Sequence, residues 1–224
     1  MLSPLTEDIW TIRHSLTVGP LPMGTRTTVL RLADGRVVVH APGALSPEDV
    51  AAIRAIGPVA AVIAPNPMHH LFLGAALAAF PEAEGWGAPG VEAKQPALKL
   101  RSYGDGAGPW TGTLETHAVA GATRLGETVL FDPRSRTLIL TDLAFNIREV
   151  DGWFAKMNLQ MLDAYGRFGP SFLCRNWFIT DAKVARRSID RILAWAPERI
   201  VVAHGEVVEG GGEAALREAF AWMR

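Results

Sequence analysis

The run VAAVIA, Val59–Ala64, is apolar at every position and constrains the fold more than any other stretch of the chain. A helix is predicted before it, over Ser46–Gly57, because Ser46 suits a helix cap and Pro47 the first helical position. A second helix is predicted after it, over His69–Phe80. A strand with no polar position is buried on both faces, so the sequence predicts a sheet covered by helices.

Further strands and helices are predicted around this unit. The expected strands are Asp8–His14, Thr27–Leu32, Arg36–Pro42, Leu114–Gly121, a hairpin within Glu127–Asp142, and a last strand that leads to His204. The expected later helices are Asp181–Trp195, with Asp181 as its cap, and a closing helix at the C-terminus. From Glu82 to Thr111 the pattern weakens, and GWGAPG (85–90) and SYGDGAGPW (102–110) are loop-like because glycine and proline are dense there. The two halves share one order, in which strands and a helix lead to a strand that ends at a histidine.

Length and charge narrow the class of protein. A chain of 224 residues, 49% of them hydrophobic, suits one packed domain, which we expect to span residues 1–224. A formal net charge of −1 provides no field for nucleic acid or for an anionic membrane surface. The lone Cys174 fits a reducing compartment, and no apolar run approaches the ~20 residues that span a bilayer. With no signal-peptide pattern at the start, the sequence predicts a cytoplasmic protein.

Histidine and aspartate side chains follow three of the predicted strands. His69 and His70 come after Val59–Ala64 and a Pro-Asn-Pro turn, Asp142 follows the second strand of the hairpin, and His204 follows the last strand. Ligands of such sheets bind beyond the strand ends, and imidazole and carboxylate are ligands of zinc and iron. We therefore predict that these four residues form a site for a divalent metal ion, zinc or iron.

Each of these residues also has a structural interpretation. A histidine near a strand end is often hydrogen-bonded or solvated, and Asp142 is placed to cap the segment that begins at Leu143. His40 also ends a strand and is a candidate to lie near the site, whereas His14 and His117 fall within strands and are interpreted as structural.

The order of these elements and residues resembles the metallo-β-lactamase fold superfamily over nearly the whole chain. It is most similar to an uncharacterised branch that is known only as a domain of unknown function. The resemblance implies an α+β fold, an αββα sandwich of two similar halves, with a metal site at one edge.

The superfamily carries a His-x-His-x-Asp-His motif after the apolar strand of its first half. The matching stretch here is Pro65 to His70, in which His70 stands for the final histidine and His69 for the aspartate. Pro65 and Pro67 stand in the places of the first two histidines. Two ligands of the family's first metal position are therefore missing.

The rest of the family's ligand set matches in part. Asp142 stands for the bridging acid and His204 for the last histidine, but Gly121-Ala122 replaces the usual Gly-His pair. The resemblance thus implies one metal position, built from His69, His70, Asp142 and His204.

Superfamily members mostly hydrolyse esters, thioesters, amides or phosphodiesters with a metal-bound hydroxide. The resemblance implies a mononuclear metal-dependent hydrolase of a small molecule, in which His69 is either a metal ligand or the catalytic general base. The alternative is a protein that keeps the fold, has lost catalysis, and binds a small ligand or a partner.

The segment Phe145–Phe178 is rich in aromatic residues. One hypothesis makes it a lid that shapes the site for an apolar substrate. Helix packing and a contact in a homodimer are equally open interpretations.

Overall fold

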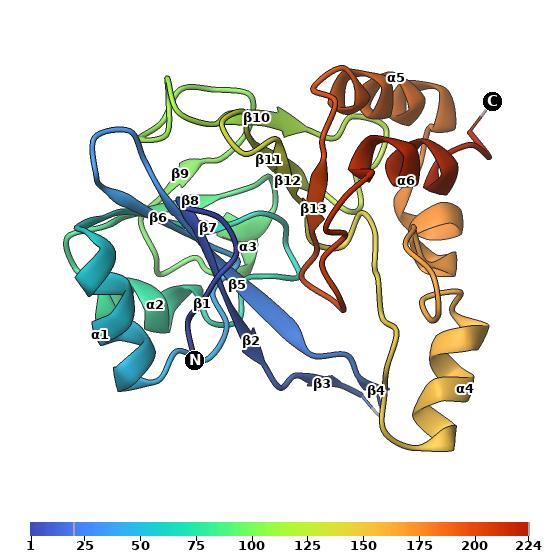
Figure 1. Cartoon of the computed structure of the whole chain (residues 1–224), viewed down its shortest axis with the longest axis horizontal. Coiled ribbons are helices and arrows are strands. Elements are labelled where there is room, and N and C mark those ends of the chain that lie inside the picture. The colour runs from blue at the N-terminus through green and yellow to red at the C-terminus, as the bar shows by residue number, and fades with distance from the viewer. Residues whose placement is uncertain (20, 224) are drawn as a thin grey trace.

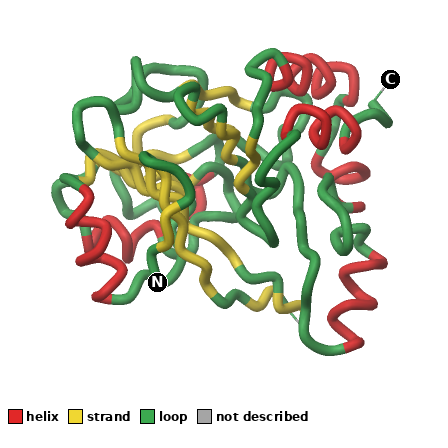
Figure 2. Tube along the Cα trace, viewed as in Figure 1, coloured by secondary structure: helices red, strands yellow, loops and turns green. Residues whose placement is uncertain are grey.

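Two β-sheets face each other and helices cover their outer sides in the computed structural model, which describes residues 1–19 and 21–223 (Figures 1 and 2). The larger sheet has seven strands in the order β1-β2-β5-β6-β7-β8-β9. Its strands are β1 (Ser3–Pro4), β2 (Ile9–His14), β5 (Thr25–Arg31), β6 (Val37–His40), β7 (Val59–Ala64), β8 (Glu84–Gly87) and β9 (Leu100–Ser102). β7 pairs in parallel with both β6 and β8, so the apolar strand lies inside the sheet as predicted.

The smaller sheet has four strands in the order β10-β11-β12-β13. They are β10 (Glu115–Ala118), β11 (Thr128–Asp132), β12 (Thr137–Ile139) and β13 (Arg199–Val201). The predicted hairpin is present as the antiparallel pair β11–β12. A separate two-stranded hairpin, β3 (Thr17–Val18) and β4 (Leu21–Pro22), contacts the α4 helix.

The helices divide between the two sides of the sandwich (Figure 1). They are α1 (Pro47–Ile56), α2 (Leu73–Ala79), α3 (Val91–Lys94), α4 (Trp153–Met161), α5 (Ala182–Leu193) and α6 (Gly212–Ala219), with a π-helical turn at Cys174–Phe178. α1 and α2 lie on the side of the larger sheet, and α5 and α6 on the side of the smaller one, which confirms the predicted α+β class. Among the described residues, no helix combines the length and apolar character that crossing a membrane requires.

The helix caps that the sequence suggested are present. The Ser46 side chain accepts a hydrogen bond from the Asp49 N–H, and the Asp49 side chain accepts from the Ser46 N–H, which completes a capping box. Asp181 caps α5 by accepting hydrogen bonds from the N–H groups of Lys183 and Val184.

The predicted helix over His69–Phe80 was wrong at its start, because α2 begins only at Leu73. Asn66 explains the difference. Its side-chain oxygen accepts hydrogen bonds from the N–H groups of Met68 and His69, at 2.7 and 3.1 Å, and holds this stretch in turns.

The prediction of loop over residues 85–90 was wrong at its start, because β8 extends to Gly87, and α3 and β9 also lie where the pattern was weak; residues 103–110 form no helix or strand, as predicted. Glycines that suggest loop instead leave room there for close packing. A Cβ on Gly85 would stand 2.9 Å from side-chain atoms of both Leu77 and Leu100, and one on Gly87 would stand 2.9 Å from the Cβ of Val91.

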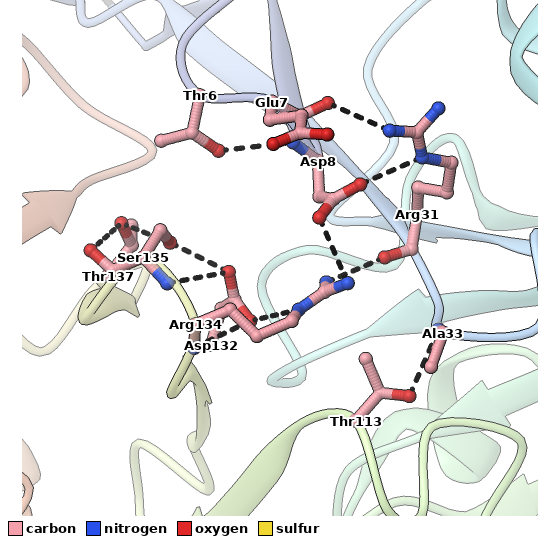
Figure 3. A network of polar contacts seen from close by, with 10 residues as sticks. All are labelled: Thr6, Glu7, Asp8, Arg31, Ala33, Thr113, Asp132, Arg134, Ser135 and Thr137. Carbon is pink, nitrogen blue, oxygen red and sulfur yellow. Dashed lines mark hydrogen bonds and ion pairs between the residues drawn. The ribbon is translucent and has the colours of Figure 1, made fainter.

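Ion pairs and hydrogen bonds join the larger sheet to the β11–β12 hairpin (Figure 3). Asp8 accepts from Arg31 Nε at 2.8 Å and from Arg134 Nη1 at 3.0 Å. Arg134 also donates to the Arg31 carbonyl and to the buried Asp132 carboxylate, which in turn accepts from the Ser135 hydroxyl. The hairpin of the smaller sheet is therefore fixed against two strands of the larger one.

Candidate metal centre

Three of the predicted ligands meet at one edge of the two sheets. His69 lies in the turns after β7, Asp142 follows β12, and His204 follows β13. His69 Nε2 lies 3.1 Å from one carboxylate oxygen of Asp142, and His204 Nε2 lies 3.2 Å from the other. One donor atom from each of the three residues lies within 4.8 Å of the others.

Asn66 connects the first strand-end turn to the second. It is fully buried, and its amide nitrogen donates to Asp142 Oδ2 at 2.7 Å and to the Thr141 hydroxyl at 2.9 Å. Its oxygen already accepts from the N–H groups of Met68 and His69. One side chain thus sets the position of both His69 and Asp142.

Glu127 holds the turn that carries Asp142, and the sequence analysis did not find it. Its buried carboxylate accepts hydrogen bonds from three successive backbone N–H groups, those of Thr141, Asp142 and Leu143, at 2.7 to 2.9 Å. Burial, together with the charge of Asp142, raises the pKa of Glu127 despite these hydrogen bonds. An ionisable residue directly before the apolar strand β11 was the available signal.

His204 is oriented for coordination through Nε2. Its Nδ1 lies 2.7 Å from the Gly24 carbonyl oxygen, which accepts only, so the Nδ1 atom carries a hydrogen. Without an ion, a protonated Nε2 donates to Asp142; once Nε2 loses that proton, it holds the lone pair that a metal ion needs. Burial opposes protonation of His204, but the hydrogen bond and charge of Asp142 outweigh it and raise the pKa.

Asp142 is held as a carboxylate. Burial alone would raise its pKa, but the charge of His69 and the hydrogen bonds from His204 and His69 together lower it well below its ordinary value. The site therefore presents an anionic oxygen donor between two imidazoles.

The remaining predicted ligand, His70, is not part of this cluster. Its Nδ1 lies 2.8 Å from the Pro67 carbonyl oxygen, so Nδ1 carries the hydrogen and Nε2 is the proton-accepting nitrogen. His70 lines the same pocket as the cluster. His40, the other candidate, is fully buried, and neither of its ring nitrogens has a hydrogen-bond partner among the described residues.

His14 and His117 lie in strands as expected, and His14 Nε2 is 2.8 Å from the Thr27 hydroxyl. Cys174 is wholly buried, and burial together with the charges of Glu127 and Asp142 raises the pKa of its thiol, so it is poorly suited to act as a nucleophile.

A pocket of about 610 Å³ opens beside His69, Asp142 and His204. Its walls come from the β3–β4 hairpin, the turns after β7, and the segment from Phe145 to Phe178. Its size lies within the usual range of small-molecule sites, about 300–1,000 Å³.

The three clustered side chains fit a single divalent ion. Two imidazole nitrogens and one carboxylate oxygen are a donor set that zinc and iron both accept, and three protein ligands leave a position open for water or substrate. Asn66, Glu127 and the Gly24 carbonyl oxygen orient these donors, as supporting residues do around metal sites.

Residues 6–161, more than half of the chain, match the family described as "Domain of unknown function (DUF4336)". The chain belongs to this family. No curated protein matches the sequence.

Solved structures with the same fold are metallo-β-lactamases and related proteins. The chain aligns over its full length with TMB-1 (TM-score 0.69, 12% identity, 96% of that chain). It aligns equally over its length with a metallo-β-lactamase from Pontibacter korlensis (TM-score 0.67, 12% identity, 98% of that chain). The Flv1 flavodiiron core from Synechocystis sp. PCC6803 gives a TM-score of 0.66 at 12% identity, with 60% of that chain covered. At such identities these likenesses establish the metallo-β-lactamase fold for this member of the DUF4336 family, as the sequence predicted.

Proposed function

We propose that this protein is a mononuclear metal-dependent hydrolase of a small molecule. The convergence of His69, Asp142 and His204 at the wall of a pocket carries the proposal. These three side chains would hold one zinc or iron ion. When bound, such an ion lowers the pKa of a bound water molecule and polarises the bond to be cleaved.

His69 is a metal ligand in this proposal rather than the general base. Its Nε2 and that of His204 face the two oxygens of one carboxylate, which makes the two histidines equivalent members of the donor set. We assign the proton-accepting role to His70, because its Nε2 is free to accept while Nδ1 bonds to the Pro67 carbonyl oxygen.

Elemental analysis of protein purified without chelator tests the metal site. We expect about one zinc or iron ion per chain in the wild type, since one donor set of three residues is present. His69→Ala, Asp142→Ala and His204→Ala should each lose most of the metal. The matched variant His70→Ala should keep it, and two ions per chain in the wild type would contradict the proposal.

Turnover of the metal-loaded protein tests the chemistry. The panel consists of thioesters, aryl esters, lactones, phosphodiesters and a β-lactam. We expect hydrolysis of a member other than the β-lactam, and a loss of about 10²–10⁴-fold in His70→Ala at unchanged metal content.

The alternative function, a ligand-binding protein without catalysis, is favoured by one observation. Both oxygens of Asp142 already have imidazole partners within the chain, so the three residues form a satisfied hydrogen-bonded group without an ion. Absence of metal after zinc addition, together with inactivity across the panel, would select this alternative.

A further inference from the structure

We propose that the pocket takes an amphiphile that combines a hydrocarbon chain with an anionic group. The chain would lie between the β3–β4 hairpin and α4, and the anion would lie at Lys94 and Arg124. Binding of this amphiphile does not depend on the proposed function, whereas its hydrolysis rests on the proposed function.

The walls of the pocket favour a hydrocarbon chain. Leu21 and Met23 on one side and Leu159 and Leu162 on the other belong to one apolar cluster that joins the hairpin to α4. Asp142 is the one carboxylate among the described residues that line the pocket, and its charge is shared by two histidines. An apolar chain buried here gains roughly 25 cal/mol for each Å² removed from water.

The rim of the pocket is apolar as well, although it faces solvent. Val18, Met68, Leu71 and Leu173 line the opening and are 40% to 60% exposed. Single exposed apolar residues are common on protein surfaces, whereas a group around one opening is typical of a binding surface. The rim therefore extends the apolar surface available to a chain.

Two cations at the pocket favour an anion. Lys94 and Arg124 are exposed, and neither has a carboxylate partner in the described part of the chain. The Arg124 guanidinium lies 4.6 Å from the centre of the Trp177 ring and donates to the Trp177 carbonyl oxygen, which fixes its position. A guanidinium held in place and an unpaired ammonium attract a carboxylate or phosphate group.

Cleavage of an ester or thioester in such a molecule is balanced by one water molecule. The water oxygen bonds to the acyl carbon, the bond from that carbon to the leaving oxygen or sulfur breaks, and a proton passes to the leaving atom. The products are a carboxylic acid and an alcohol or thiol, and no oxidant or reductant is needed.

Displacement of bound dansyl-undecanoate, followed by fluorescence, tests the binding part without any turnover. We expect affinity to rise from butanoate to octanoate to dodecanoate, because each added methylene buries apolar surface. Dodecanoate should bind about tenfold more tightly than dodecyltrimethylammonium, which carries the same chain and the opposite charge. No dependence on chain length, or equal affinity for the two charges, would overturn the proposal.

Charge-reversal variants locate the anion. Lys94→Glu combined with Arg124→Glu should weaken dodecanoate about tenfold or more and leave uncharged dodecanol within about twofold. The matched control is Lys99→Glu combined with Arg187→Glu, two exposed cations outside the pocket, which should bind dodecanoate as the wild type does. Equal loss in both double variants would refute the assignment of the anion to the pocket.

Variants that narrow the pocket test where the hydrocarbon chain of the ligand lies. Leu162→Trp and Leu16→Trp fill the pocket from opposite walls, and each should weaken dodecanoate far more than butanoate. Two variants from separate elements keep the test decisive if one of them fails to fold, which circular dichroism detects. Unchanged preference for dodecanoate in a folded variant would contradict the placement of the chain.

Two versions of the binding experiment distinguish an amphiphile taken from solution from one taken from a membrane. Dodecanoate is offered as dissolved monomers, and in parallel as a component of phosphatidylcholine vesicles that are then sedimented. Binding in either arm supports the proposal and identifies a dissolved or a membrane-borne source, whereas binding in neither arm overturns it. If dodecanoate binds but its thioesters and aryl esters are not cleaved by the metal-loaded protein, the proposed function fails and the ligand class stands.

Discussion

Trp86 and Trp110, in the first half of the chain, are 6% and 2% exposed, whereas Trp153 and Trp177, in the second half, are 76% and 59% exposed. The first pair packs with Tyr103: the ring centres of Trp86 and Trp110 are 4.7 Å apart, and those of Tyr103 and Trp110 are 5.2 Å apart. The second pair lies on α4 and on the π-helical turn, and Trp177 contacts Arg124, which lines the pocket.

Tryptophan therefore occurs in two different environments in this fold, one buried and one exposed. Buried tryptophans contribute to stability, because their large surface is removed from water. Exposed tryptophans contribute little to folding, so their presence on the surface requires another reason. Both halves have a buried apolar core, so we infer that the exposed aromatic residues of the segment from Phe145 to Phe178 serve the ligand proposed above rather than the fold.

The largest expected effect is the difference in stability between a tryptophan variant of the first half and one of the second half. Trp110→Ala should lower the free energy of unfolding by about 3–5 kcal/mol, because it leaves a cavity among packed rings. Trp153→Ala should change it by less than about 0.5 kcal/mol. Urea denaturation of both variants at the same protein concentration measures the difference. A large loss in Trp153→Ala would show that α4 is covered, for instance by a second copy of the chain.

His40 in the first half and His204 in the second half are both buried, but their pKa values shift in opposite directions. Burial, and to a lesser extent the charge of His69, lowers the pKa of His40 to about 3, whereas Asp142 raises the pKa of His204. On acidification below about 6.5, unfolded chains protonate His40 while folded chains do not, so stability falls with falling pH.

His40→Leu removes this contribution. Between pH 7 and pH 5 the wild type should lose about 2 kcal/mol more stability than the variant, which follows from the His40 pKa alone. Denaturant titrations at several pH values measure the difference between the two proteins. Parallel pH profiles would mean that the folded protein protonates His40 as readily as the unfolded chain does.

The junction between the two halves gives a smaller effect. Arg134→Ala removes the links of the β11–β12 hairpin to Asp8 and to the Arg31 carbonyl oxygen, and should cost about 1 kcal/mol (Figure 3). Arg217→Ala, which breaks an exposed ion pair with Glu213, is the matched control and should cost less than about 0.5 kcal/mol. Thermal denaturation compares the variants. Equal losses of stability would show that the contacts of Arg134 between the two sheets stabilise the protein no more than an exposed ion pair does.

The smallest expected effect concerns Trp177. Trp177→Ala should leave stability within about 0.5 kcal/mol of the wild type, because the side chain is exposed. It should weaken dodecanoate about two- to fivefold, since Arg124 loses the ring over which its guanidinium lies. The dansyl-undecanoate displacement assay measures it, with Trp222→Ala, an exposed tryptophan outside the pocket, as the control. An unchanged affinity would remove Trp177 from the site.

The sequence predicted the sandwich because its strongest local signals agree with the fold. The apolar strand β7, the capped helices α1 and α5, and the hairpin β11–β12 are each specified within a short stretch. β8 was missed, because its two glycines suggest loop and only the packing of neighbouring elements shows why they are there. β9 was missed because it has only three residues and gives no clear strand pattern.

The site was only partly predictable, because local patterns do not show contacts between residues that are distant in sequence. His69, Asp142 and His204 were found because each follows a strand, and strand ends meet at one edge. His70 follows the same strand, but its ring is turned toward the Pro67 carbonyl oxygen. Glu127 was missed, because its role depends on backbone N–H groups 14 to 16 positions along the chain.

The mutual bonding of His69, Asp142 and His204 has a consequence for the life of the protein in a cell. Each of the three polar groups already has a partner within the chain, so folding leaves no unsatisfied charge at this edge. Under the proposed function, synthesis and metal loading are then separable events, and newly made chains would accumulate as folded molecules without an ion. The fraction of active molecules would then follow the supply of metal, rather than the rate at which the chain is made.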